Sequence, residues 1–504
     1  MGGAGLVRLM DVVEVTDEEQ QVRLRESIDG LHERFPHLAA VRVLSRGQRR
    51  ALVILIVGVI AATALSPTNT AIGLVAAATA LYCAIILNRV ALFRASLVGE
   101  SVEAVSDEDL RSFDPRHLPV YTVLIPAYKE PEVIGSLLAS LDRLDYPRDK
   151  LDVKVLLEAD DAETIAAARE IKAGGHMTIL LVPPAEPRTK PKALNYGLSF
   201  ARGDLVTIFD AEDVPDPLQL RKAAIVLSRA PADVACVQAK LSYANGDQNI
   251  ITRWFTIEYA MWFSLLLPGL VAKKAPIPLG GTSNHFRRSI LEAVGGWDPH
   301  NVTEDADLGI RLARQGYTVR VLESITYEEA NSDFVNWVKQ RSRWYKGYLQ
   351  TWLLHIRRPR AVLNELGVRP FAQFNLFVGG TPFLAIMNPV FWVMTMVWFI
   401  AHPHVIRAIF PAPVFYAALL CWGIGNFLIA YLTILTVRLI DRPKLIFAAL
   451  AVPAYWVMMS VAAAKAFVQL ALAPSFWEKT THGLTGETTT PSHELLAPET
   501  STTG

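Results

Sequence analysis

Four apolar stretches without a charged side chain constrain the fold of this 504-residue chain more than any other feature. They cover residues 51–65, 71–88, about 374–400 and 414–437. The turn Ser66-Pro67-Thr68-Asn69 separates the first two, which predicts a helical hairpin. A membrane-spanning helix needs about 20 apolar residues, so the first stretch spans only if its flanking arginines snorkel. A buried core hairpin is the alternative, but soluble core helices rarely lack charge on every face.

Basic residues mark the ends of both pairs of stretches. The turn inside the first pair has no charge, and Arg407 is the only Lys or Arg inside the second. Because positively charged loops stay in the cytoplasm, we expect a multi-pass protein of the cytoplasmic (inner) membrane, with membrane lipid as a partner and the middle of the chain in the cytoplasm. The flanking residues are Arg42, Arg46, Arg49, Arg50, Arg89 and Arg94 for the first pair, and Arg357, Arg358, Arg360, Arg369, Arg438, Arg442 and Lys444 for the second.

The remaining segments differ in composition. The capping box Thr16-x-x-Glu19 predicts a helix near the N-terminus. The apolar stretch 445–472 contains Pro453 and Lys465, so it either crosses the membrane or lies along its surface. The expected organisation is a cytoplasmic N-terminal helical segment (1–48), a transmembrane hairpin (49–93), a soluble α/β domain (118–350), interface helices with two transmembrane helices (351–444), an interfacial or re-entrant helix (445–473), a loop (474–484) and a disordered tail (485–504).

The middle of the chain has a different pattern from its flanks. Short apolar runs of four to six residues alternate with helical stretches, which predicts a mostly parallel, Rossmann-like α/β sheet with strands buried on both faces. Ligands of such sheets bind beyond the carboxyl ends of the strands. The expected strands are 121–125, 153–157, Met177–Val182, 205–209, 234–237 and 318–322, and the expected helices are 131–144, 162–173 and 192–200.

Acidic clusters follow two of these strands and open a later helix. They are Glu158-Ala159-Asp160-Asp161, Asp210-Ala211-Glu212-Asp213 and Thr303-Glu304-Asp305-Ala306-Asp307. One such cluster alone is most simply a helix cap or a solvated loop. Three clusters at strand and helix ends predict an acidic site, and hard carboxylate oxygens suit Mg²⁺ or Mn²⁺ together with substrate phosphates.

Gln340-Arg341-Ser342-Arg343-Trp344 supplies a different chemistry. Helical spacing places Gln340, Arg343 and Trp344 on one face, where Arg can bind phosphate through its planar fork and an indole can stack on a sugar. Taken alone, the segment is an amphipathic surface helix. The 49 basic residues balance 49 acidic residues, which excludes a dedicated nucleic-acid-binding protein.

The order and spacing of these motifs resemble those of the membrane-embedded family 2 glycosyltransferases, the group that includes cellulose, hyaluronan and chitin synthases. Residues 125–131 are similar to their first nucleotide-binding strand and loop, and 190–195 to their Lys/Asn-bearing helix start. Residues 210–212 stand where DxD usually stands, 303–305 match TED, and 340–344 match QxxRW. The resemblance covers about residues 120–350 well.

The resemblance implies a GT-A fold and an inverting transfer of a sugar from a UDP-sugar, with Mg²⁺ or Mn²⁺ on the diphosphate. Asp305 would be the general base, with Glu304 beside it as a second catalytic residue. Asp210 with Glu212 or Asp213 would hold the metal. Trp344 would form an acceptor platform, and Gly281, Thr282 and Ser283 an acceptor loop, although an ordinary glycine turn explains that loop equally well. The implied nucleotide or donor contacts are Pro126, Tyr128, Glu130, Asp160, Asp161, Lys192, Asn195, Asp210, Gln340 and Arg343.

Two departures from the family pattern affect this assignment. Glu212 replaces the expected second aspartate of the metal-binding motif. Because the longer Glu212 side chain has a different reach, Asp213 is an alternative metal ligand. The segment 476–483 resembles a variant of the synthase gating loop, so Lys479, Thr480 and His482 would contact the diphosphate if it is cytoplasmic. That position requires 445–472 to lie in the membrane surface rather than cross once.

The sequence leaves two enzyme functions open. One is a processive polysaccharide synthase that passes a β-linked polymer through the membrane, as a homo-oligomer or with a secretion partner. The other is a non-processive transferase that adds one sugar to a lipid, because only about four spans are clear and ceramide glucosyltransferases carry a similar QxxRW motif. A catalytically inactive module that senses nucleotide sugar is a third reading, which the intact acids argue against.

Overall fold

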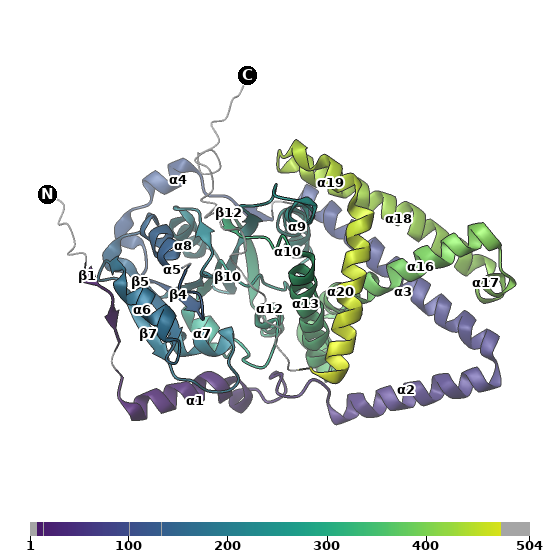
Figure 1. Cartoon of the computed structure of the whole chain (residues 1–504), viewed down its shortest axis with the longest axis horizontal. Coiled ribbons are helices and arrows are strands. Elements are labelled where there is room, and N and C mark those ends of the chain that lie inside the picture. Colours follow the sequence, from purple (N-terminus) through teal and green to yellow (C-terminus); the bar gives the residue numbers. More distant parts are fainter. Residues whose placement is uncertain (1–7, 14, 100, 133, 475–504) are drawn as a thin grey trace, which may run out of the picture.

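The computed structural model describes residues 8–13, 15–99, 101–132 and 134–474. Figure 1 shows two regions, an α/β region around a central sheet and a group of long apolar helices that projects from one side of it.

Ten strands of the described chain form one twisted sheet in the order β2-β7-β5-β4-β8-β11-β10-β12-β3, with β9 paired to β12. Most neighbouring pairs are parallel, and β11 runs antiparallel to both β8 and β10. This arrangement confirms the predicted mixed, mostly parallel α/β sheet. The strands are β2 (Asp11–Val12), β3 (Val102–Glu103), β4 (Tyr121–Ala127), β5 (Leu151–Glu158), β7 (Met177–Val182), β8 (Leu205–Ile208), β9 (Val214–Pro215), β10 (Val234–Tyr243), β11 (Asn284–Arg287) and β12 (Thr318–Glu328).

The apolar runs locate the buried strands well and the half-exposed ones less well. Strand β7 has the expected bounds, and every residue of β5 is buried. Strands β10 and β12 extend six residues beyond their predicted ends, as far as Tyr243 and Glu328. Buried and less buried residues alternate along the extension of β12, so the apolar run stops where the strand leaves the core.

The N-terminal segment contributes more than the predicted helix. Helix α1 (Asp17–Arg34) begins at Thr16, whose hydroxyl accepts a hydrogen bond from the Glu19 amide at 3.4 Å. Before it, β2 pairs with β7 at the edge of the main sheet, and β1 (Arg8–Leu9) pairs with β6 (Lys172–Ala173). The segment 1–48 is therefore not only helical; two-residue strands carry too little sequence pattern to be predicted.

Helices cover both faces of the sheet and connect its strands. The longer ones of this region are α5 (Ile134–Asp142), α6 (Ala162–Glu170), α7 (Lys190–Leu198), α8 (Gln219–Arg229), α12 (Glu304–Arg314) and α13 (Phe334–His355). The shorter ones are α4 (Asp107–Ser112), η1 (Pro115–His117), η2 (Arg148–Lys150), α11 (Arg288–Ala293) and α14 (Pro359–Leu366).

Six helices of the described chain are long and apolar enough to cross a membrane. Four of them contain the predicted stretches, and a fifth is α20 (Val452–Leu472). The sixth, Ile250–Ala272, was not predicted because Arg253 and Glu258 interrupt its apolar run. These helices are α2 (Arg46–Leu65), α3 (Pro67–Val98), α9 (Ile250–Met261) with η3 (Trp262–Leu266) and α10 (Leu267–Ala272), α15 (Val368–Phe374) with η4 (Asn375–Gly379) and α16 (Gly380–Ala401), α18 (Ala412–Leu439) and α20; α17 (His404–Ile409), η5 (Pro443–Leu445) and α19 (Ile446–Leu450) connect them.

Helix α2 exposes apolar side chains on all of its faces. None of its residues is buried, and its exposed side chains include Ile54, Leu55 and Ile60. At about 25 cal/mol per Å² of apolar surface, a helix that exposes branched aliphatic chains on every side is unstable in water but stable in lipid. A capping box at Ser45 starts the helix, and the Gln48 side chain ties that end to the Leu353 carbonyl of α13 at 2.7 Å.

Helix α20 takes a different direction from the other apolar helices. Figure 1 shows it running alongside α13 and across the directions of α2, α16 and α18. Tyr455, Ala462 and Ala466 pack inward, whereas the opposite face forms an exposed apolar stripe at helical spacing. The stripe consists of Ala454, Val457, Val461, Ala464, Val468 and Leu472.

Candidate active site

A cavity of about 760 Å³ lies where the α/β region meets the apolar helices. One end is walled by the loops that follow β4 and β8 and by the start of α12, and the other by α3, α16, α18 and α20. The cavity therefore lies at the carboxyl ends of the strands, as expected for a ligand site in an α/β sheet, and extends to the apolar helices.

The acidic turn after β8 places two of its carboxylates in the cavity wall and buries the third. Asp210 and Glu212 line the cavity. Asp213 is buried beneath them, where it accepts hydrogen bonds from the Asp210 amide at 2.7 Å and from the Thr282 hydroxyl. Burial, and then the charge of Asp210, raises the pKa of Asp213 well above its usual value. Asp213 thus supports the turn through Oδ2 and does not line the cavity, and its role as an alternative metal ligand stays a prediction.

The lysine at this site is Lys190 and not the predicted Lys192. Lys190, the first residue of α7, donates hydrogen bonds to Asp210 Oδ1 and, at 2.9 Å, to the Gly281 carbonyl. Lys192 is fully buried outside the cavity wall and pairs with Glu158 at 2.8 Å. Lys190 therefore lines the cavity, whereas Lys192 does not.

Glu304 and Asp305 begin α12 and face the same cavity. Burial, followed by the charge of Asp305, raises the pKa of Glu304 to about 7. Burial also raises the pKa of Asp305 to about 6, although the Ala306 amide and Lys190 lower it. A carboxyl group that titrates near neutrality and faces a cavity can accept a proton from a bound hydroxyl group.

The predicted acceptor loop is split between the cavity and the core. Gly281 and Thr282 line the cavity, but the Thr282 hydroxyl donates to Asp213 and also lies 3.0 Å from the Ile208 carbonyl oxygen. Ser283 is fully buried and bonds to Thr326 at 2.7 Å. Of the three residues, Gly281 presents its backbone to the cavity, and Ser283 does not fit an acceptor contact.

The predicted aspartate pair after β5 lies at the edge of the site. Asp161 caps α6 and accepts a hydrogen bond from the Lys129 amide at 2.5 Å, so it shapes the loop after β4. Asp160 is more exposed and pairs with Arg188 at 2.7 Å. Arg188, which the sequence did not single out, lines the cavity and also contacts the Tyr128 hydroxyl at 3.4 Å. Pro126, Tyr128 and Glu130 line the cavity as predicted residues of that loop.

Asn195 has a structural position away from the cavity wall. Its side-chain amide donates to the carbonyls of Ser27 and Trp297 at 3.0 and 2.8 Å, and its oxygen accepts from the Trp297 amide at 2.9 Å. These bonds join α7, α1 and the loop before α12. They leave no side-chain group for the nucleotide contact that the motif predicted.

Helix α13 brings the QxxRW residues to the cavity. Gln340, Arg343 and Trp344 all line it, and Gln340 accepts a hydrogen bond from the Asn331 side chain at 2.8 Å. The Trp344 ring stacks on Tyr259 with ring centroids 6.1 Å apart. The indole therefore lines the cavity with one face against the Tyr259 ring.

The neighbouring Arg341 forms a buried ion pair that the sequence did not reveal. Its guanidinium contacts both carboxylate oxygens of Glu258, and the Tyr455 hydroxyl donates to Glu258 at 2.6 Å. The same guanidinium lies 4.5 Å from the centre of the Trp344 ring. The pair links α9, α13 and α20 beside the cavity.

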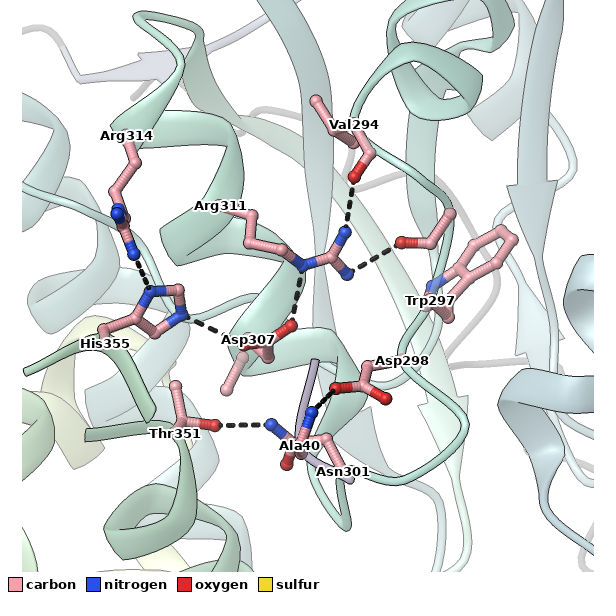
Figure 2. Close-up of polar contacts among 12 residues, drawn as sticks. Ala40, Val294, Trp297, Asp298, Asn301, Asp307, Arg311, Arg314, Thr351 and His355 are labelled. Atoms are coloured by element: carbon pink, nitrogen blue, oxygen red, sulfur yellow. Dashed lines mark hydrogen bonds and ion pairs between the residues drawn. The ribbon is translucent and has the colours of Figure 1, made fainter. Parts of the chain in front are cut away.

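A second buried polar network fixes α12 against α13, as Figure 2 shows. Asp307 binds Arg311 at 2.7 Å and the His355 ring at 3.0 Å, and His355 contacts Arg314 at 2.9 Å. The Arg311 guanidinium also donates to two carbonyls of the loop before α12. Because Asp307 lies one half-turn from Asp305, this network sets the position of the cavity carboxylates without touching the cavity.

Two glycines allow close approaches that this arrangement requires. A Cβ on Gly309 of α12 would lie 1.9 Å from the Ile277 carbonyl oxygen. A Cβ on Gly347 of α13 would lie 2.3 Å from the Thr303 side chain, immediately before Glu304. Both helices therefore pack by backbone contact next to the cavity carboxylates.

The donor set of the site suits a hard divalent cation. Within the described residues, no group of three or more His, Cys, Asp and Glu side chains is placed to hold a metal. Asp210 and Glu212 supply two cavity carboxylates, which is the usual protein share of a Mg²⁺ site completed by substrate phosphates. Burial, followed by the charges of Asp213, Asp210 and Glu212, also raises the pKa of Glu328 well above normal. A cation would relieve this crowding of like charges.

The gating-loop residues Lys479, Thr480 and His482, together with the predicted disordered tail, lie outside the described residues.

The α/β region is similar to known glycosyltransferases. Residues 118–347 match the family model described as "Glycosyltransferase like family 2". The probable glycosyltransferase YdaM of Bacillus subtilis is 31% identical over 238 residues, which are 46% of this chain and 56% of YdaM. A probable glucomannan 4-beta-mannosyltransferase of Arabidopsis thaliana is 27% identical, over 46% of this chain and 43% of its own. The beta-monoglucosyldiacylglycerol synthase of Trichormus variabilis is 26% identical, over 52% and 58%.

The chain spans about half the length of the curated relatives it matches. Residues 118–347 are similar to the family 2 glycosyltransferases, and their mixed, mostly parallel sheet is the arrangement expected for a GT-A fold.

Proposed function

We propose that this domain transfers one sugar from a UDP-sugar to a hydroxyl group of a membrane lipid, with inversion at the anomeric carbon. The observation that carries the proposal is the cavity, which runs without a break from the acidic strand ends to helices α3, α16, α18 and α20. A lipid hydroxyl could enter from the apolar end while the nucleotide sugar occupies the polar end.

Asp305 is the proposed general base. Its pKa of about 6 leaves it largely ionised at neutral pH but basic enough to accept the acceptor proton. The sugar moves in one displacement, the diphosphate leaves with the bonding electron pair, and Asp305 takes the hydroxyl proton. Glu304 lies beside the base, and Gln340 and Arg343 are placed to face the negative charge that develops on the leaving group.

Asp210 and Glu212 would hold Mg²⁺ or Mn²⁺ against the diphosphate. The bound metal would supply positive charge to the leaving diphosphate. Lys190 donates hydrogen bonds to Asp210, a proposed metal ligand, and to the Gly281 carbonyl. It therefore joins the acidic turn after β8 to the loop that contains Gly281.

The apolar helices support a lipid acceptor better than a growing polymer. In the cavity wall, the Tyr82 hydroxyl donates to the Asn388 side-chain oxygen at 3.0 Å, so α3 and α16 meet through paired polar groups. Helix α2 has no buried residue and extends away from the other helices, which leaves few walls for a polymer channel. Transfer to a growing polysaccharide is the second candidate function. It is favoured by the Trp344 ring, which stacks on Tyr259 and offers an aromatic surface for a sugar acceptor.

The proposed location is the cytoplasmic membrane, with the glycosyltransferase domain in the cytoplasm as the basic flanks predict. The exposed stripe and crosswise direction of α20 support a position along the membrane surface. A helix there would keep the following segment on the cytoplasmic side, where the proposed gating residues could reach the nucleotide.

Product size tests the proposal. Purified protein in detergent receives a radiolabelled UDP-sugar panel, mixed lipid and either Mg²⁺, Mn²⁺ or chelator, and products are separated by chain length. We expect one lipid-soluble monoglycoside that requires the metal and is lost in Asp305→Asn. A ladder of water-soluble oligomers would refute the lipid acceptor, and full activity of Asp305→Asn would refute the base.

A further inference from the structure

The apolar end of the cavity contains a cation whose charge is not balanced. Arg89 of α3 lines the cavity, and its guanidinium donates a hydrogen bond to the neutral Thr381 hydroxyl of α16 at 3.3 Å. Its Nε atom is buried and has no hydrogen-bond partner among the described residues. The sequence assigned Arg89 to a basic flank, but the structure turns it into the helix bundle.

The neighbouring charges do not neutralise Arg89. Glu258 attracts it, but both oxygens of that carboxylate contact Arg341, and one also accepts a hydrogen bond from Tyr455. Two guanidinium groups therefore share one carboxylate, and no ion pair involving Arg89 exists in the part of the chain that the structure describes. Buried charges inside a membrane bundle are costly unless paired, and they commonly mark a ligand site.

The depth of Arg89 matches the level of lipid headgroups. From Pro67, the far end of α3, to Arg89 the helix rises about 33 Å at 1.5 Å per residue. The hydrocarbon core of a bilayer is about 30 Å thick, so Arg89 lies near the boundary on the side of the glycosyltransferase domain. Beyond it, the cavity wall becomes largely apolar, with Ile86, Leu384 and Ile429.

The same cavity connects Arg89 with the proposed base. Arg89, Tyr348 and Asp305 all line it. Burial and then the charge of Asp305 raise the pKa of Tyr348, while Arg341 and Arg89 lower it. A lipid held at Arg89 can therefore extend its headgroup along the cavity towards the acidic end.

We propose that Arg89 binds the phosphate of an anionic lipid, which presents a headgroup hydroxyl to Asp305 while its chains lie along Ile86, Leu384 and Ile429. The inference rests on the proposed lipid acceptor and narrows it to phospholipids with a free hydroxyl. Arginine suits this role because its planar fork matches phosphate oxygens and it remains charged when partly buried.

Binding, measured without catalysis, tests the site. The full-length protein in maltoside micelles, which contain no phosphate, is titrated with radiolabelled phosphatidylglycerol or with diacylglycerol, which has a hydroxyl but no phosphate. We expect the wild type to bind phosphatidylglycerol at least roughly 10-fold more tightly than diacylglycerol. Arg89→Gln should weaken phosphatidylglycerol binding roughly 10- to 100-fold, the range for a lost hydrogen bond to a charged group. Arg89→Lys should retain most of the affinity.

Arg94→Gln is the matched control, because Arg94 lies five residues further along α3 and is exposed. It should bind like the wild type. Equal binding of the two lipids by the wild type would overturn the inference even if Arg89→Gln did not fold. So would unchanged binding by a folded Arg89→Gln, or displacement of the lipid by millimolar inorganic phosphate, which would identify a soluble anion as the ligand. A polymer product would refute the lipid acceptor separately, because the binding assay does not depend on the product.

Discussion

Removal of the Lys190 charge should move the acidic limb of the pH–activity profile to higher pH. A Cβ built on Gly281 would lie 3.4 Å from Asp305 Oδ2 and 4.0 Å from Lys190 Nζ, so the two charged atoms are at most about 7 Å apart. At an effective dielectric constant of about 20, this attraction is worth about 2 kcal/mol. Since 1.36 kcal/mol corresponds to one pKa unit, the lysine lowers the pKa of Asp305 by about 1.5 units.

The sign follows from the role of Asp305 as a base. Only its ionised form accepts a proton, so activity falls as the pH falls through its pKa of about 6. Lys190→Gln removes the attraction, raises the pKa and should move the half-maximal point of kcat/KM to between about 7 and 8.

The assay is kcat/KM for sugar transfer between pH 5 and 9 at saturating metal. Lys190→Arg keeps the charge and is the matched control, so its acidic limb should stay near that of the wild type even if its rate is lower. An unchanged limb in Lys190→Gln would refute the electrostatic coupling of Lys190 to the base. A limb that moved in both variants would show a change of geometry instead of charge.

Two further predictions concern the packing that holds the base. In Gly347→Ala the new Cβ would lie 2.3 Å from the Thr303 side chain and displace it, which should lower kcat about 10- to 100-fold. Gly423→Ala is the control, because no atom lies within 4 Å of its new Cβ, and it should leave kcat unchanged. Asp307→Asn removes a buried carboxylate from Arg311 and should cost about 3–5 kcal/mol, seen as a lower melting temperature. The exposed Asp142→Asn should melt like the wild type, and an equal loss in both variants would contradict the special role of the network.

The sequence predicted the sheet because its strands are buried on both faces. Continuous apolar runs such as Met177–Val182 locate such strands, and the acids that follow them were therefore expected at one edge of the sheet. Asp210, Glu212, Glu304 and Asp305 do meet in one cavity. The helix Ile250–Ala272 was missed because Arg253 and Glu258 interrupt its apolar run, and the pairing of Glu258 with the distant Arg341 is visible only in the structure.

By itself, the sequence determined the α/β domain, the charge-free helices and the acidic motifs, since each depends on periodicity or composition over a few neighbouring residues. Only the tertiary structure decided which member of each motif faces the cavity. Lys190 rather than Lys192 reaches it, and Asp213 turns away from it, because a helix or turn points adjacent side chains in different directions. The same holds for Arg89. The sequence shows that a basic residue follows the apolar stretch, but the cavity that this side chain faces is formed by helices distant in the chain.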